Sequence, residues 1–92
     1  GGKQEEVVAP ATIVVSLPAE ARLFVDGAAT TSVSERRTLV TPNLQVGTTY
    51  VYTIRAEIVR DGRTVEESQI VNVTGGQVSN VRFNFSQSVA SR

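Results

Sequence analysis

The carboxylates are the side chains of this sequence whose spacing could support catalysis. Glu66 and Glu67 are neighbours, and Glu57 is predicted to lie across a hairpin from Glu66. Glycoside hydrolysis requires two carboxylates held at a defined separation. Neighbouring residues of a strand point to opposite faces of the sheet, and the chain has no histidine or cysteine to complete a polar cluster. We therefore interpret these three residues as solvated charges on strands.

Asp26 and Asp61 are the candidate ligands for a calcium ion, which requires several oxygen atoms converging in one loop. Each aspartate stands alone and is followed by a glycine. The Asp-Gly pair is typical of two-residue type I′ hairpin turns, so a turn explains both residues. Serine and threonine are plentiful, but no hydroxyl has a candidate base beside it. The sequence predicts a protein that is not an enzyme, with no catalytic residue, cofactor or metal.

Tyr50 and Tyr52 could bind a sugar ring by stacking if both faced solvent. Their even numbering places them on the same strand face as Ile54, Ala56 and Ile58, which we expect to be buried. Two interpretations follow: buried tyrosines whose hydroxyls reach an edge, or an exposed aromatic pair. The second would make the protein a carbohydrate- or peptidoglycan-binding module.

Composition excludes several classes of partner. The 92 residues include nine basic and nine acidic side chains, so the net charge is zero. Nucleic-acid-binding proteins normally carry a basic stripe, and no apolar run approaches the roughly 20 residues of a membrane helix. We expect neither nucleic-acid binding nor membrane insertion. Arginines alternate with glutamates, and the expected result is a set of cross-strand ion pairs drawn from Arg55, Arg60, Arg63 and Arg82 with Glu57, Glu66 and Glu67.

The stretch from Tyr50 to Val59 carries the clearest structural signal. Apolar side chains dominate its even positions and polar ones are common at the odd positions, a period of two that is typical of a strand. Asp61-Gly62 follows as a predicted hairpin turn, and residues 63–74 return as a second long strand. Within it the pattern slips, so we expect Glu67 and Gln69 to lie beyond the core or beside a β-bulge.

Other strands are predicted at residues 12–17, 21–25, 36–41 and 77–85, separated by turn residues. Asp26-Gly27 and Gly75-Gly76 are the remaining predicted structural turns. Six to seven strands without a substantial helix predict an all-β fold, a small antiparallel β-sandwich of immunoglobulin-like type. We expect one domain over 11–85, a linker or tag remnant over 1–10, and a C-terminal linker over 86–92.

The segments "PAEARLFVDG", "RRTLVTPNLQVGTTYVYTIRAEIVRDGRTV" and "VNVTGGQVSNVRFNF" resemble a small all-β domain family of unknown function from planctomycete bacteria. That family is similar to PEGA-type domains, whose signature falls at Pro18–Ala21, although this chain has Ala-Glu-Ala where the signature has Glu-Gly-Ala. The resemblance covers about Ala11 to Phe85. It implies a β-sandwich accessory module of bacterial cell-envelope or secreted proteins and assigns no activity.

These observations together predict a non-catalytic spacer or protein–protein interaction module, located outside the cytoplasm or in the cell envelope. Its partner would be an unknown protein or a neighbouring module. The consecutive apolar residues Ile13, Val14 and Val15 are the candidate interaction edge, through which weak self-association is expected, because an apolar edge strand pairs readily with another chain. The segment Ala28–Glu35 is the candidate cover of another edge.

Overall fold

Two long strands at the centre of the fold have buried and exposed side chains in alternation. In the computed structural model, which describes residues 6–85, the side chains of Ile54, Ala56 and Ile58 are buried, whereas Val51 and Val59 on the opposite face are exposed. No residue of the described range is helical. The strands are β1 (Val8–Ala9), β2 (Thr12–Ser16), β3 (Arg22–Val25), β4 (Ala28–Ala29), β5 (Arg36–Val40), β6 (Leu44–Gln45), β7 (Thr49–Arg60), β8 (Arg63–Thr74) and β9 (Val78–Arg82).

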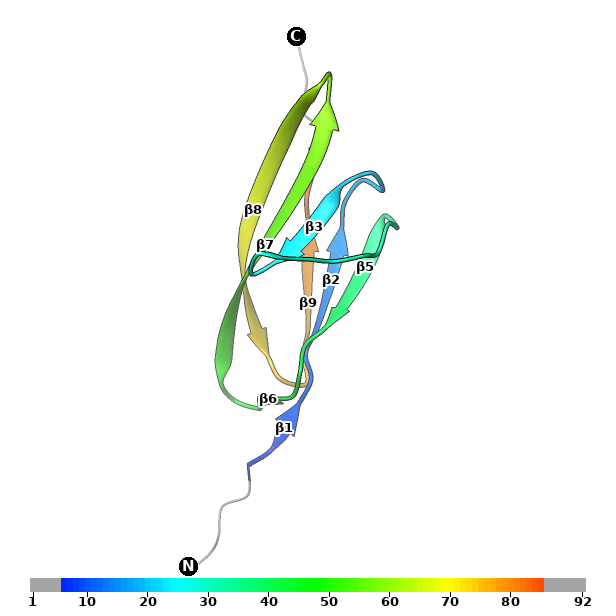
Figure 1. Ribbon diagram of the computed structural model, residues 1–92. Helices are drawn as coiled ribbons and strands as arrows, with labels where there is room; N and C mark the ends of the chain where they lie inside the picture. The colour runs from blue at the N-terminus through cyan, green and yellow to red at the C-terminus, as the bar shows by residue number, and fades with distance from the viewer. Residues whose placement is uncertain (1–5, 86–92) are drawn as a thin grey trace, which may run out of the picture.

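The strands form two layers with the apolar core between them (Figure 1). One layer is a sheet in the order β4-β3-β7-β8, the other is a sheet in the order β5-β2-β9, and β1 pairs with β6 at one end. This arrangement confirms the predicted all-β, sandwich-like fold. Pairing is antiparallel with one exception, the parallel pair of β2 and β9. The chain crosses from one layer to the other after β8, which brings its last strand alongside an early one.

Two Asp-Gly turns connect strands of the larger sheet. Asp26 and Gly27 have φ values of 48° and 86°, and Asp61 and Gly62 have 53° and 75°. Positive φ at both central residues defines the type I′ turn, whose twist matches that of the flanking strands. Asp26 also accepts a hydrogen bond at Oδ1 from the Thr53 amide at 2.8 Å. Both aspartates therefore have structural explanations.

The strand β8 continues without the bulge that was one of the two explanations offered for Glu67 and Gln69, and neither residue lies beyond the core. Glu67 pairs with Ala56 and Gln69 with Ile54 in an unbroken register. Both side chains are half-buried, and the Gln69 Nε2 atom donates a hydrogen bond to the Arg82 carbonyl at 2.6 Å. Gln69 interrupts the apolar pattern because its side chain bonds to β9 across the seam between the two sheets.

The N-terminal boundary of the folded part lies earlier than residue 11. The strand β1 pairs with β6, and the Val46 amide donates to the Val7 carbonyl at 2.9 Å. Residues 7–10 thus belong to the fold and not to a linker. The predicted linker over 86–92 and the first five residues lie outside the described range.

Gly75 is needed where β1, β6 and the β8–β9 turn meet. A Cβ atom on it would lie 2.8 Å from the Leu44 carbonyl oxygen and 2.9 Å from that of Ala9. Both are backbone atoms, so a larger residue forces the backbone to shift, a change that typically costs about 1–3 kcal/mol. Gly75→Ala is expected to lower the free energy of unfolding by that amount in urea denaturation. Gln77→Ala, at an exposed position of the same connection, is the control and should change stability by less than about 0.5 kcal/mol.

Candidate interaction surfaces

The predicted interaction edge is wrong, because β2 is the central strand of its sheet. Residues Ile13, Val14 and Val15 pair with β5 on one side and with β9 on the other. Ile13 is 1% exposed and Val15 is fully buried. The run of apolar residues arises because Ile13 and Val15 face the core while Val14 is half-buried on the outer face.

The free edges lie elsewhere. The three-stranded sheet ends at β5 and β9, and the four-stranded sheet ends at β4 and β8. The segment Ala28–Glu35 supplies the two-residue edge strand β4 and then crosses to β5. Near the seam, β8 is joined to β9 by side chains, since Ser79 Oγ donates to the Asn72 carbonyl at 3.2 Å and Gln69 bonds to Arg82. The other half of β8, Arg63–Ser68, pairs only with β7 within the described chain.

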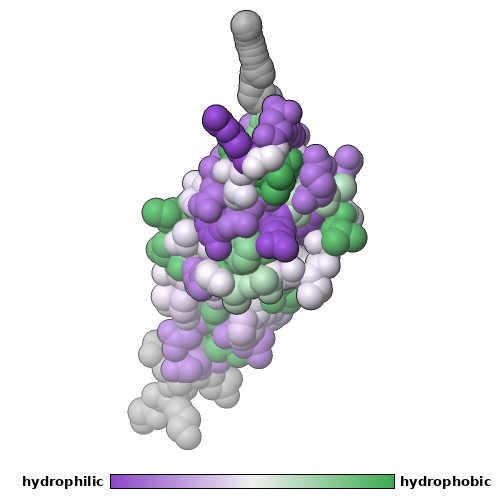
Figure 2. Space-filling view, turned by 45° about the horizontal axis from the view of Figure 1, so that its top comes forward, coloured by the Kyte–Doolittle hydropathy of each residue, from purple (hydrophilic) through white to green (hydrophobic). Residues whose placement is uncertain are grey.

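Charged side chains interrupt this half of β8. Its residues include Arg63, Glu66 and Glu67, and charges on an edge strand discourage pairing with another chain. Figure 2 shows the molecule with the hairpin end brought forward, and apolar residues form separate patches among polar ones on this face. Scattered apolar residues are normal on a protein surface, so the face shown in Figure 2 has no broad apolar area suited to docking.

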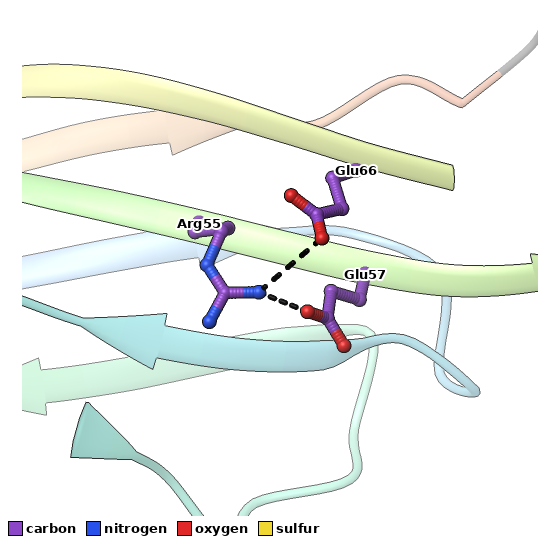
Figure 3. A network of polar contacts seen from close by, with 3 residues as sticks. All are labelled: Arg55, Glu57 and Glu66. Carbon is purple, nitrogen blue, oxygen red and sulfur yellow. Dashed lines mark hydrogen bonds and ion pairs between the residues drawn. The ribbon is translucent and has the colours of Figure 1, made fainter. Parts of the chain in front are cut away.

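A cluster of three charged residues lies on the outer face of β7 and β8. Glu57 and Glu66 are directly opposite in the β7–β8 register. The Arg55 Nη1 atom contacts Glu57 Oε2 and lies 3.8 Å from Glu66 Oε2, so one guanidinium serves both carboxylates (Figure 3). The Arg55 guanidinium also lies 4.0 Å from the centre of the Phe24 ring. The prediction of cross-strand ion pairs is confirmed for Arg55 and Glu66, whereas Glu57 lies on the same strand as Arg55.

The other three arginines that were expected to form such ion pairs do not join Arg55. Arg82 lies in the opposite sheet, and Arg60, at the tip of the hairpin, donates from Nη1 to the Phe85 carbonyl at 2.8 Å. Arg63 is exposed on the other side of the hairpin turn. The arginines therefore form no continuous strip.

Removing Arg55 should leave two carboxylates facing each other without a cation. Arg55→Ala is expected to lower the free energy of unfolding by about 1 kcal/mol at low ionic strength, since partly exposed ion pairs contribute little and like charges opposite each other are unfavourable. The loss should shrink in 1 M NaCl, where screening acts over about 3 Å. Urea denaturation at the two salt concentrations measures both. If the loss of stability were equal at low and high salt, the packing of Arg55 on the Phe24 ring, and not its charge, would account for it.

Arg37 is the buried charged residue that the sequence analysis missed. It is 1% exposed and lies on the core side of β5, opposite Val15. Its Nε atom donates to the Ser34 carbonyl at 2.8 Å, and its Nη2 atom donates to the Ala19 carbonyl at 3.0 Å. The Nη1 atom has no hydrogen-bond partner in the described chain. Burial lowers the pKa of the Arg37 guanidinium from its usual value, and the side chain ties together two loops at one end of the sandwich. Arg37 and Leu39 are alternate residues of one strand and therefore face the same side of the sheet. Since Leu39 is apolar, this spacing could have indicated that Arg37 faces the core.

The five aromatic side chains provide no outward-facing pair for a sugar. Tyr50 and Tyr52 are half-buried and pack against the core, and the Tyr50 hydroxyl accepts a hydrogen bond from the Gln45 amide at 3.0 Å. Phe83 and Phe85 are buried. Phe24 alone lies on an outer face, where Arg55 covers its ring. This arrangement disfavours the carbohydrate-binding alternative.

A hollow of about 330 Å³ lies between β3 and the hairpin, lined by Glu20, Arg22, Glu57, Ile58, Val59 and Thr64. Its two carboxylates are accompanied by an arginine. Within residues 6–85, no group of three or more histidine, cysteine, aspartate or glutamate side chains is placed to hold a metal ion. The same range contains no helix long and apolar enough to cross a membrane.

Comparison with known proteins yields no match to a protein-family model, to a curated protein or to a solved structure. The resemblance to PEGA-type domains therefore depends on the sequence segments quoted above.

Proposed function

We propose that this chain is a non-catalytic accessory module of a larger bacterial envelope or secreted protein, and that it acts as a spacer. The observation that carries the proposal is the position of the two ends of the described chain. The strand β1 lies at one end of the sandwich beside β6, while Phe85 lies at the other end beside Arg60 of the hairpin (Figure 1). If neighbouring domains are attached at these two opposite ends, the module separates them by its full length.

The long hairpin sets that length. The strand β7 has 12 residues, which at about 3.4 Å per residue span about 40 Å. Hydrogen bonds fix both ends of the described chain to the sandwich. The Val46 amide bonds to the Val7 carbonyl at one end, and the Arg60 side chain bonds to the Phe85 carbonyl at the other. These contacts favour a rigid separation over a flexible one. The resemblance to PEGA-type accessory modules supports the same role.

Small-angle X-ray scattering on two copies fused end to end tests the spacer role. The fused pair should show a maximum dimension about 40 Å or more above that of one copy. A pair that packs side by side, with a thicker cross-section and little added length, would argue against a spacer. Fusion through a flexible glycine-serine linker of 20 residues serves as the control, since it allows side-by-side packing.

The predicted protein–protein contact also has a candidate surface, the free edge of β8 over Arg63–Ser68, where the charged residues would discourage every partner strand except one of complementary charge. The backbone groups on the free side of this segment lack a strand partner in the described chain, and strand addition is a common mode of peptide recognition. Pull-down by the larger parent protein, compared between the unchanged module and Thr64→Pro, tests this surface, because the Thr64 amide points to the free side of β8 and not to β7. Retention of binding by the proline variant would exclude pairing along this edge, because proline removes an amide donor and fits poorly into a paired strand.

A further inference from the structure

A row of two arginines and one serine crosses the outer face of the three-stranded sheet. Ser16 of β2 pairs with Arg36 of β5 on one side and with Arg82 of β9 on the other. All three side chains point outward, because the adjacent residues Val15, Arg37 and Val81 are buried. Neighbouring strands are about 4.8 Å apart, so the Cα atoms of the two arginines are separated by about 10 Å. Side chains as long as arginine can converge across that distance above Ser16.

The outward residues of these three strands include two arginines and no carboxylate. The other outward residues are uncharged: Thr12, Val14, Thr38, Val40, Val78 and Asn80. Within residues 6–85 neither Arg36 nor Arg82 forms an ion pair. Glu35 is the nearest carboxylate along the chain, and it lines an adjoining hollow at the end of the sheet, together with Ser16 and Arg82.

Arg37 adds a third positive charge at the same end of the sheet. Its guanidinium bonds to backbone carbonyls of Ser34 and Ala19 and to no carboxylate in the described chain. A buried charge is screened by salt less than an exposed one. The chain as a whole is neutral, whereas the charged residues on the outer face of this sheet are both arginines, Arg36 and Arg82, and Arg37 lies beneath them on the core side.

A hollow of about 260 Å³ lies between the two arginines, lined by Val14, Ser16, Arg36, Asn80, Val81 and Arg82. Guanidinium groups bind phosphate and sulfate through paired hydrogen bonds in a fixed planar geometry. The Ser16 hydroxyl and the Asn80 amide can supply further donors to the same anion. The lining therefore offers hydrogen-bond donors of the kind that a tetrahedral oxyanion requires.

We propose that this hollow, defined by Arg36, Ser16 and Arg82, is a binding site for a tetrahedral oxyanion of the phosphate or sulfate type. The proposal concerns the outer face of the smaller sheet and is independent of the spacer role. The oxyanion is either free in solution or carried by a lipid headgroup, and the chemistry of recognition is the same in both cases.

Titration of the ¹⁵N-labelled protein with sodium phosphate, monitored by NMR, tests the site directly. We expect saturable shifts of the Ser16, Arg36, Asn80 and Arg82 amide signals, and no saturable shift with sodium chloride at matched ionic strength. Equal responses to phosphate and chloride would show general ionic screening and overturn the proposal. The absence of saturable shifts would also overturn it.

Matched variants assign the binding to the two arginines. Arg36→Gln and Arg82→Gln should each weaken phosphate binding about tenfold, which corresponds to about 1.4 kcal/mol, and the double variant should abolish saturation. Arg63→Gln, at an exposed arginine in the hairpin, is the control and should bind as the parent does. Thermal unfolding of each variant verifies that its fold is retained. Saturable binding by a folded double variant would contradict the assignment.

Sedimentation with vesicles identifies the source of the oxyanion. Vesicles of phosphatidylcholine are compared with vesicles that also contain phosphatidylglycerol. Sedimentation with the anionic vesicles that is lost in the double variant would support a membrane-borne oxyanion. Binding of free phosphate without sedimentation would support a soluble one.

Discussion

Ile54→Ala is expected to lower the free energy of unfolding by about 2–5 kcal/mol, as large-to-small substitutions in a packed core do. Ile54 is fully buried at the centre of β7, between the two layers. The substitution removes buried apolar atoms and leaves a cavity that the surrounding strands fill only in part. A domain of this size has a total stability of about 5–14 kcal/mol, so the loss is a large fraction of the whole. Urea denaturation followed by circular dichroism provides the measurement.

Ile70→Ala is the matched control for this prediction. Ile70 is the same residue type on the adjacent strand, but it lies on the outer face and is 74% exposed. Its truncation should change stability by less than about 0.5 kcal/mol. If Ile54→Ala proves too unstable to purify, Ile54→Val should still cost about 0.5–1.5 kcal/mol. Equal losses at the two isoleucines would contradict the assignment of inner and outer faces.

The second large effect is expected at Arg37. Arg37→Ala should lower the free energy of unfolding by about 3 kcal/mol, because hydrogen bonds from a charged donor contribute about 1.5–3 kcal/mol and their loss leaves buried acceptors unsatisfied. The Ser34 and Ala19 carbonyls would lose the donors that now hold their loops together. Arg37→Lys should be intermediate, since a single ammonium lacks the planar fork that reaches both loops.

Arg36→Ala provides the comparison for Arg37→Ala. Arg36 precedes Arg37 on β5 but is exposed on the outer face, and its removal should have little effect on stability. Chemical denaturation of both variants under the same conditions shows whether the loss of stability arises from removing a buried side chain or from removing a positive charge. Similar small losses at both positions would show that the buried hydrogen bonds contribute little.

Local patterns in the sequence predict much of this fold. The alternation at Ile54 and Ile58 depends on the geometry of a single strand, and the Asp26 and Asp61 turns depend on the backbone preferences of two adjacent residues. Such features need no knowledge of the rest of the chain. For this reason the six longer strands, the long hairpin and the core sides of β2, β3, β7 and β9 follow from the sequence, whereas the two-residue strands β1, β4 and β6 do not.

Features that depend on distant parts of the chain were not predictable in this way. Alternation shows which face of β2 is buried but not which strands flank it, so Ile13–Val15 was mistaken for an edge. The parallel pairing of β2 with β9 requires the chain to cross between layers. Arg37 is buried because carbonyls from two separate loops surround it, and Gly75 is constrained by the carbonyls of Ala9 and Leu44. The row of Arg36, Ser16 and Arg82 likewise exists only through the register of three strands.

The most direct test of the two-layer architecture uses the absence of cysteine from this chain. Single cysteines are introduced along β7 at buried positions, Ala56 and Ile58, and at exposed positions, Val51, Thr53 and Val59. The rate of reaction with a thiol reagent is then measured under native conditions. The account predicts rapid labelling at the three odd positions and strong protection at the two even ones. Uniform labelling along the strand, or a period near 3.6 residues, would contradict it.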